Sequence, residues 1–181
     1  MSLAYRAKRS RRLAIALCGT GQPDPLAMTA ARQVGRLVAE ADCTLICGGM
    51  YGVMEAACAG AQEARQKGAG GLVVGILPGA DPDGANAYCD VVVATGMGAA
   101  RNALVVLSAD AVILIGGGAG TLSEAALAWQ FGKPVIGLAS SGGWAARLAG
   151  EAIDERRPDR VLEARSPEEA VSTALGCAGR R

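Results

Sequence analysis

The stretch Ile113–Trp129, ILIGGGAGTLSEAALAW, runs from an apolar segment through four glycines in five positions into an alanine-rich segment. The apolar segment predicts a buried strand, and the alanine-rich segment predicts a helix that begins near Thr121. A glycine-rich turn lets a backbone come close to a ligand, and the first N–H groups of a helix favour an anion. The stretch therefore predicts a phosphate site at the carboxyl end of a strand.

The same alternation of short apolar runs and longer helical patterns extends along the whole chain. The predicted strands are Leu13–Cys18, Thr44–Cys47, Leu72–Leu77, Asp90–Val93, Ala111–Ile115, Pro134–Leu138 and Val161–Ala164. The predicted helices are Pro25–Ala41, Val53–Lys67, Met97–Leu107, Thr121–Phe131, Trp144–Ala152 and Pro167–Leu175. This order predicts an α/β fold, a Rossmann-like, doubly wound and mainly parallel sheet of about seven strands with helices on both faces. We expect one domain over residues 13–181.

The composition fits a folded chain of 181 residues that is built from small side chains. Hydrophobic residues make up 51% and aromatic residues only 3%, so alanine, valine, leucine and isoleucine must form the core. Side chains of this size allow backbones to pack closely. The net charge of +1 gives no general attraction to nucleic acid or to an anionic membrane. No apolar run reaches the roughly 18 residues of a membrane span, and we expect a cytoplasmic protein.

The first twelve residues contain the basic run RAKRSRR, which predicts a solvated, disordered leader; contact with a polyanion is the alternative. The six cysteines contain no CxxC pair and the chain has no histidine, so no metal site is expected. Without histidine, any general acid or base must be another residue type.

Glycine-rich turns follow each of the first five predicted strands. In open α/β sheets ligands bind beyond the carboxyl ends of the strands, so five such turns at one edge predict a binding crevice. The candidate ligand contacts in these turns are Gly19, Thr20, Gly21, Gly48, Gly49, Met97, Gly117, Gly118, Gly120 and Thr121. A dinucleotide GxGxxG is excluded by Asp24 in the first turn and by Thr121 in the fifth, and no lysine follows Gly120 as a Walker loop requires.

Glu124 and Arg101 are the charged candidates for the same crevice. Thr121 and Glu124 have the T-x-x-E spacing of a capping box, and this structural interpretation is as well supported as a catalytic one. Arg101 lies in a stretch that is otherwise uncharged from Val91 to Leu107. A guanidinium suits bidentate capture of phosphate, and the neighbouring Asn102 could assist it or cap a helix.

The blocks CGGMYGVMEAACAGAQEARQKGAGGLVVGILP and MGAARNALVVLSADAVILIGGGAGTLSEAALAW resemble the Lonely-guy (LOG) family, whose hallmark is PGGxGTxxE. The resemblance covers about Leu13 to Leu138. Within it, the chain looks most like the small Rossmann-like branch that includes molybdenum-cofactor carrier proteins. Gly116 replaces the hallmark proline, and Asn102 stands where the hydrolases of the family usually have lysine. Both differences favour the carrier-like branch.

The resemblance implies a homodimer that binds a nucleotide or another phosphorylated small molecule, with no nucleic acid and no membrane as partner. As in the hydrolase branch, Glu124 and Arg101 would cleave the N-glycosidic bond of a nucleoside 5′-monophosphate, and no cofactor would be needed for catalysis. Gly117, Gly118, Gly120 and Thr121 would bind the phosphate. The alternative is a carrier or sensor that holds a nucleotide or molybdenum cofactor without turnover.

The family's older label, possible lysine decarboxylase, is not supported by the lysines of this chain. A pyridoxal-phosphate enzyme needs a Schiff-base lysine. Lys133 stands at the amino end of a predicted strand, at the edge of the sheet opposite to the glycine-rich turns.

Overall fold

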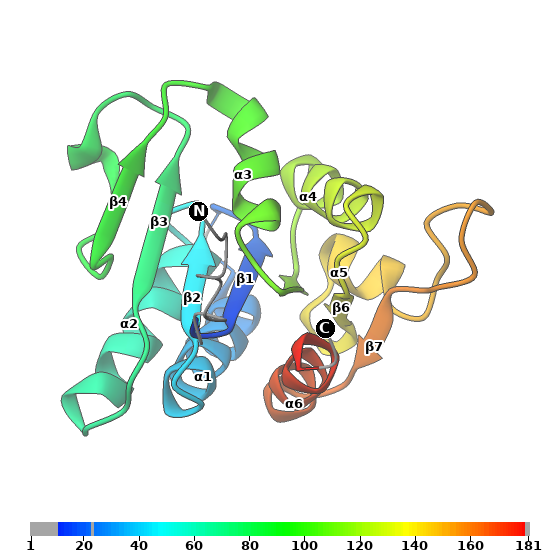
Figure 1. Cartoon of the computed structure of the whole chain (residues 1–181), viewed down its shortest axis with the longest axis horizontal. Coiled ribbons are helices and arrows are strands. Elements are labelled where there is room, and N and C mark those ends of the chain that lie inside the picture. Colours follow the sequence, from blue (N-terminus) through cyan, green and yellow to red (C-terminus); the bar gives the residue numbers. More distant parts are fainter. Residues whose placement is uncertain (1–10, 23, 180–181) are drawn as a thin grey trace, which may run out of the picture.

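The computed structural model describes residues 11–22 and 24–179, and its core is one seven-stranded sheet (Figure 1). The strands are β1 (Ala14–Gly19), β2 (Thr44–Cys47), β3 (Val73–Leu77), β4 (Val91–Ala94), β5 (Ala111–Ile115), β6 (Val135–Leu138) and β7 (Leu162–Ala164). They are hydrogen-bonded in the order β4-β3-β2-β1-β5-β6-β7, and every pair is parallel. The predicted Rossmann-like, doubly wound fold is confirmed, and each strand begins and ends within one residue of its predicted range.

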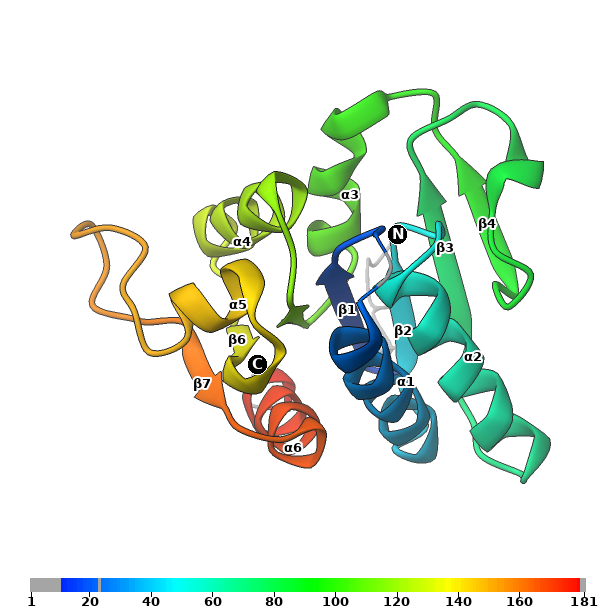
Figure 2. The same cartoon turned by 180° about the vertical axis from the view of Figure 1, so that it is seen from behind.

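Helices cover both faces of the sheet (Figure 1). The α-helices are α1 (Pro25–Glu40), α2 (Val53–Gln66), α3 (Asn102–Leu107), α4 (Ala119–Gln130), α5 (Gly143–Leu148) and α6 (Pro167–Ala178). The 3-10 helices are η1 (Pro82–Gly84), η2 (Gly98–Arg101) and η3 (Ala139–Ser141). Seen from behind in Figure 2, α1, α2 and α6 lie against one face, and α3, α4 and α5 lie against the other.

Alternate residues of the central strands face opposite layers of the core. Ile15 and Leu17 of β1 pack with α1 and α2, whereas Ala16 and Cys18 pack with the layer of α3 and α4. Side chains on both faces of a central parallel strand are buried, and this explains why the strands are continuous apolar runs in the sequence. The cysteines that the structure describes are free thiols.

Local capping explains the helix starts that the sequence predicts correctly. Asp24 caps α1 by accepting the N–H groups of Leu26 and Ala27, and Pro25 follows it in the first turn. Ser166 caps α6 by accepting the N–H of Glu169. These side chains satisfy donors that the helix itself leaves unpaired.

Four predicted helices differ from the structure by two residues or more. The predicted Pro167–Leu175 helix continues to Ala178. Met97–Leu107 is divided into η2 and α3, with Gly98 at a φ of 57° just after Met97. The predicted Trp144–Ala152 helix ends already at Leu148. The helix expected to begin at Thr121 begins two residues earlier, at Ala119, with Gly118 as its N-cap.

The basic leader lies mostly outside the described residues, which start at Arg11. Arg11 forms an ion pair with Asp110, and Arg12 forms one with Asp42. Asp110 also accepts the N–H of Ala14 at 2.9 Å, so the beginning of β1 is joined to the segment that leads into β5. In the described part of the chain, no helix has both the length and the apolar composition needed to cross a membrane.

Helices α1 and α2 pack against each other through glycine. A Cβ atom on Gly35 would lie 1.9 Å from the carbonyl oxygen of Ala57, and one on Gly60 would lie 1.9 Å from that of Arg32. Both distances are far below a van der Waals contact, and the obstructing atoms are backbone. The small residues predicted from the composition therefore set the spacing of this layer.

We expect Gly35→Ala to lower the free energy of unfolding by about 2 kcal/mol, because overpacking outweighs the helix propensity that alanine adds. The matched control is Gly176→Ala in α6, where an added Cβ meets no atom within 4 Å. The control should raise stability by roughly 0.5–1 kcal/mol. Urea denaturation measures both, and equal effects of the two substitutions would contradict the close packing.

Candidate functional site

The sheet has its topological switch point between β1 and β5. The chain proceeds from β1 outward to β4 on one side and then from β5 outward to β7 on the other. Gly19, the last residue of β1, is in register with Ile115, the last residue of β5. Loops that leave neighbouring strands toward opposite sides open a crevice at this point, which is where ligands bind in such folds.

A cavity of about 300 Å³ lies at this switch point. Its lining residues are Thr20, Gln22, Asp24, Gly116, Gly117, Gly118 and Gly143. They come from the loop after β1, the turn after β5 and the start of α5. This volume is at the lower end of the range of small-molecule sites, about 300–1,000 Å³.

The first turn of α4 presents unpaired donors at the cavity. Within the described part of the chain, no acceptor pairs with the backbone N–H groups of residues 117–121. A Cβ on Gly118 or Gly120 would meet no atom within 4 Å, so packing inside the protein does not require glycine at either position. Free amides at a helix start attract an anion, and glycine lets the anion come close.

The glycine turn that carries these amides is held in place from both sides. Gly116 and Gly117 have φ values of 58° and 97°, which side-chain-bearing residues rarely adopt. The hydroxyl of Ser141 accepts the N–H of Gly116 at 2.8 Å and donates to the carbonyl of Leu138 at 2.6 Å. The carbonyl of Gly117 accepts the N–H of Trp144. The turn is thus preorganised by the end of β6 and the start of α5.

The capping-box interpretation of Thr121 and Glu124 is wrong. Thr121 is the third residue of α4, because the glycine turn continues directly into the helix. Gly118 is the N-cap residue, and no side chain accepts a hydrogen bond from the first turn of α4. The Thr121 hydroxyl is buried against Gly117 and has no hydrogen-bond partner among the described residues. Glu124 is therefore available for another contact.

Glu124 and Arg101 are brought together, as the sequence predicts. Nη1 of Arg101 lies 3.5 Å from Oε1 of Glu124 and 2.8 Å from Oδ1 of Asn102, and both charged residues are less than one-tenth exposed. The guanidinium packs against Gly48, where an added Cβ would lie 2.5 Å from Nη2. The Nε atom of Arg101 is buried without a partner in the described structure. One donor of this guanidinium is therefore unsatisfied among the described residues.

Burial raises the pKa of Glu124 from 4.5 to about 7, although the charge of Arg101 and a hydrogen bond with Cys18 lower it. The same burial, together with the charge of Glu124, raises the pKa of the Cys18 thiol well above its usual value. The carboxyl of Glu124 thus changes protonation near neutral pH, where a general acid or base works best.

The remaining predicted contacts fall into three groups. Thr20, Gly117 and Gly118 line the cavity. Gly19, Gly48 and Gly49 are packing positions, because an added Cβ would collide with Val53, Arg101 and Leu77, respectively. Gly21 has space around it, Asn102 pairs with Arg101, and Met97 is 49% exposed.

Sequence reasoning does not single out Gln22, Asp24 or Gly143 as cavity residues. Gln22 and Asp24 belong to the loop Gly19–Asp24, which the sequence indicates only as a whole as a source of base contacts. The Gly142–Gly143 pair after the sixth strand was a usable signal, since it repeats the pattern of the other glycine-rich turns.

Among the described residues, no group of three or more Cys, Asp or Glu side chains is placed to hold a metal ion. Lys133 lies at the amino end of β6 and donates to the carbonyls of Leu107 and Ala109.

The raised pKa of Glu124 predicts a pH-dependent stability. A carboxyl whose pKa is raised by folding stabilises the protein fully below about pH 4.5, and this stabilisation is lost as the pH rises through about 7. Glu124→Gln should remove the contribution of this carboxyl to the pH dependence of stability. We therefore expect the free energy of unfolding of the variant, relative to that of wild type, to change by about 3 kcal/mol between pH 4.5 and 8. Urea midpoints across this range measure it, with the exposed Glu151→Gln as control. Parallel curves for Glu124→Gln and wild type would contradict it.

Comparisons with known proteins extend over most of the chain. An uncharacterized protein from Archaeoglobus fulgidus is 47% identical over 124 residues, which cover 68% of this chain and 78% of that protein. The molybdenum cofactor binding protein from the phototrophic bacterium Rippkaea orientalis is 37% identical, with a TM-score of 0.77 and coverage of 92% of this chain and 98% of that one. The molybdenum cofactor carrier protein of Chlamydomonas reinhardtii is 26% identical, with a TM-score of 0.75 and coverage of 94% and 100%.

The predicted resemblance to the LOG-like proteins and their carrier branch is confirmed by these comparisons. The model of the SLOG cluster4 family matches residues 12–171. Since this match includes every strand of the sheet and the whole glycine-rich crevice, the chain belongs to the SLOG cluster4 family.

Proposed function

We propose that this protein binds a phosphorylated pterin of the molybdenum-cofactor type at the crevice between β1 and β5 and carries it without turnover. The observation that carries the proposal is the run of unpaired amides over residues 117–121, which begins at two glycines, Gly117 and Gly118, that line a cavity of about 300 Å³. The molybdenum cofactor binding protein of Rippkaea orientalis, 37% identical over nearly the whole chain, supports the same ligand class.

In this proposal the phosphate occupies the glycine turn and the amino end of α4. The amides of Gly118 and Gly120 donate to its oxygens, and the buried Thr121 hydroxyl gains the partner that the protein alone does not give it. Charge-assisted hydrogen bonds of this kind are stronger than neutral ones. Among the described residues, no lysine or arginine lines the cavity, so backbone dipoles would supply the attraction.

The pterin ring would extend toward the loop after β1. Oδ1 of Asp24 already accepts two amides of α1, while its Oδ2 has no partner among the described residues. A carboxylate oxygen suits the N–H groups on the pyrimidine edge of a pterin. The side-chain amide of Gln22 can donate and accept beside it. These two residues would provide recognition of the ring.

A carrier is favoured over a hydrolase by the position of Glu124. Its side chain is 8% exposed and paired with Arg101, and it is not part of the cavity lining. A carboxylate that stabilises a ribosyl cation or activates water must reach the reacting carbon. The second candidate, a nucleoside 5′-monophosphate phosphoribohydrolase, is supported by the pKa of Glu124 near 7. A homodimer, the cytoplasm as compartment, and the absence of nucleic acid as a partner remain predictions.

The binding proposal is tested by substituting Gly118. In Gly118→Ala the added methyl group projects into the open space of the crevice, and we expect the dissociation constant for molybdenum cofactor to rise by about tenfold, or 1.4 kcal/mol. Gly176→Ala, the same change in α6, should bind like wild type. Fluorescence titration of the purified chain with the cofactor measures both. Absence of saturable binding by wild type, or equal binding by both variants, contradicts the proposal.

Incubation with a panel of nucleoside 5′-monophosphates separates a carrier from a hydrolase. We expect wild type to release no free base above the level of Glu124→Gln, because Glu124 is held away from the cavity by its pairing with Arg101. Chromatography of the released base is the measurement. Release by wild type that disappears in Glu124→Gln would establish the hydrolase instead.

A further inference from the structure

Three cysteines from distant parts of the chain meet beneath α2. Cys47 ends β2, Cys58 lies on α2, and Cys89 precedes β4. The sulfur atoms of Cys47 and Cys58 are 3.5 Å apart, and the sulfur atoms of Cys58 and Cys89 both contact the side-chain amide of Asn86. The three thiols therefore form one cluster around a buried amide.

The side-chain amide of Asn86 contacts two of these thiols. Its Nδ2 lies 3.7 Å from the sulfur of Cys58, and its Oδ1 lies 3.8 Å from the sulfur of Cys89. Asn86 is 4% exposed, and its Nδ2 also donates to the carbonyls of Gly49 and Met50. One buried amide thus holds both thiols in place and joins them to the loop after β2.

Cys89 is the one partly exposed residue among the three cysteines. Cys47 and Cys58 are fully buried, whereas Cys89 lines a cavity of about 510 Å³. This cavity is bounded by polar side chains, including those of Arg32, Gln62, Glu63 and Asp90. Cys89 is therefore the member of the cluster that lies nearest to solvent.

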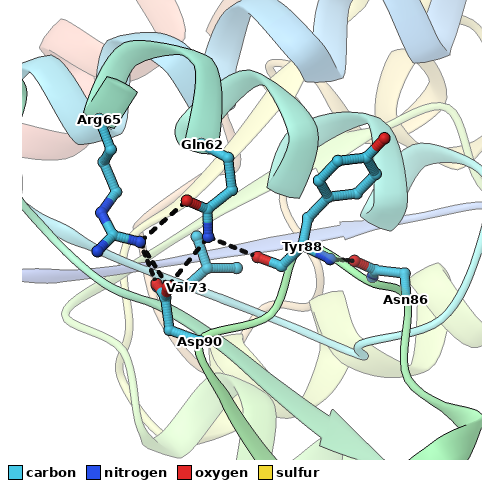
Figure 3. Close-up of polar contacts among 6 residues, drawn as sticks. All are labelled: Gln62, Arg65, Val73, Asn86, Tyr88 and Asp90. Atoms are coloured by element: carbon cyan, nitrogen blue, oxygen red, sulfur yellow. Dashed lines mark hydrogen bonds and ion pairs between the residues drawn. The ribbon is translucent and has the colours of Figure 1, made fainter. Parts of the chain in front are cut away.

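The segment that carries Cys89 is fixed to α2 on both sides of the thiol (Figure 3). Gln62 donates from Nε2 to the carbonyl of Tyr88 at 2.9 Å and to Oδ1 of Asp90 at 3.0 Å. Arg65 forms an ion pair with Asp90 at 2.5 Å, and Asp90 accepts the N–H of Val73 at 2.7 Å. These contacts keep Cys89 beside Cys58, which lies on the same helix as Gln62 and Arg65.

The surroundings of the two thiols give them different roles. Interaction with Cys58 lowers the pKa of Cys89, whereas interactions with Cys47 and Cys89, together with burial, raise the pKa of Cys58. The thiolate is the reactive form of cysteine, so the partly exposed cysteine is also the more nucleophilic one. Cys58 keeps its proton until a partner sulfur has been oxidised.

We propose that Cys89 is an oxidation site for hydrogen peroxide and that Cys58 resolves it into an intramolecular disulfide. The Cys89 thiolate attacks one oxygen of peroxide and forms an S–O bond as the O–O bond breaks, and the departing hydroxide takes up a proton to give water. The sulfur of Cys58 then displaces hydroxide from the Cys89 sulfenic acid, forming the S–S bond, and its proton leaves with that hydroxide as a second water. Two thiols are oxidised and one peroxide is reduced.

The test treats the reduced full-length chain with an equimolar amount of hydrogen peroxide, followed by alkylation, proteolysis and mass spectrometry. We expect the intact mass to fall by two hydrogen atoms and the peptides of Cys58 and Cys89 to be linked. A chain that keeps all its thiols in excess peroxide, or a disulfide that omits Cys89, such as Cys47–Cys58, overturns the proposal. This measurement uses wild type and does not depend on the folding of a variant.

Trapping the intermediate tests the order of events. In Cys58→Ser the sulfenic acid at Cys89 should persist and react with dimedone, at least tenfold more than in wild type. In Cys89→Ser the dimedone adduct and the disulfide should both be lost. Cys177→Ser, which alters a thiol on α6 outside the cluster, is the matched control and should behave like wild type. Equal dimedone labelling of Cys89→Ser and Cys58→Ser contradicts the assignment of Cys89 as the attacking thiol.

Discussion

The unpaired amides at the start of α4 are the feature on which the candidate site depends. They are free because β5 is buried on both faces between β1 and β6, so the chain must leave the sheet sharply at Gly116. The turn continues into a helix without a side-chain cap, and its donors stay unsatisfied. Unpaired N–H groups cost little free energy at an exposed edge, because water can bind them there. An anion that replaces this water would form stronger, charge-assisted hydrogen bonds.

The family resemblance implies that the phosphate-binding glycines and the charged residues Glu124 and Arg101 act in one site, whereas the structure places the two groups apart. The proposed anion site is made of backbone groups at the crevice, whereas the charged pair of Glu124 and Arg101 lies buried on the layer of α3 and α4. This separation agrees better with holding a ligand than with attacking it.

The sheet and the proximity of Glu124 to Arg101 could be predicted from the sequence because both follow from topology, whereas their ion pair and their place outside the cavity lining were not predicted. Apolar runs fix the strands, and strand order brings the ends of β1, β2 and β5 to one edge. The start of α4 was missed because T-x-x-E is a local pattern that a glycine turn can override. The glycine pair at Gly142 and Gly143 indicates a further turn, but its place in the cavity depends on the path of the chain after β6.

The buried carboxyl of Glu124 has a consequence for the energetics of ligand capture. With a pKa of about 7, it is divided between its neutral and anionic forms under physiological conditions. A phosphate that settles nearby adds negative potential, which favours the neutral form. If the proposed ligand binds, Glu124 would take up a hydrogen ion from the buffer on binding and return it on release, so that binding would be linked to pH.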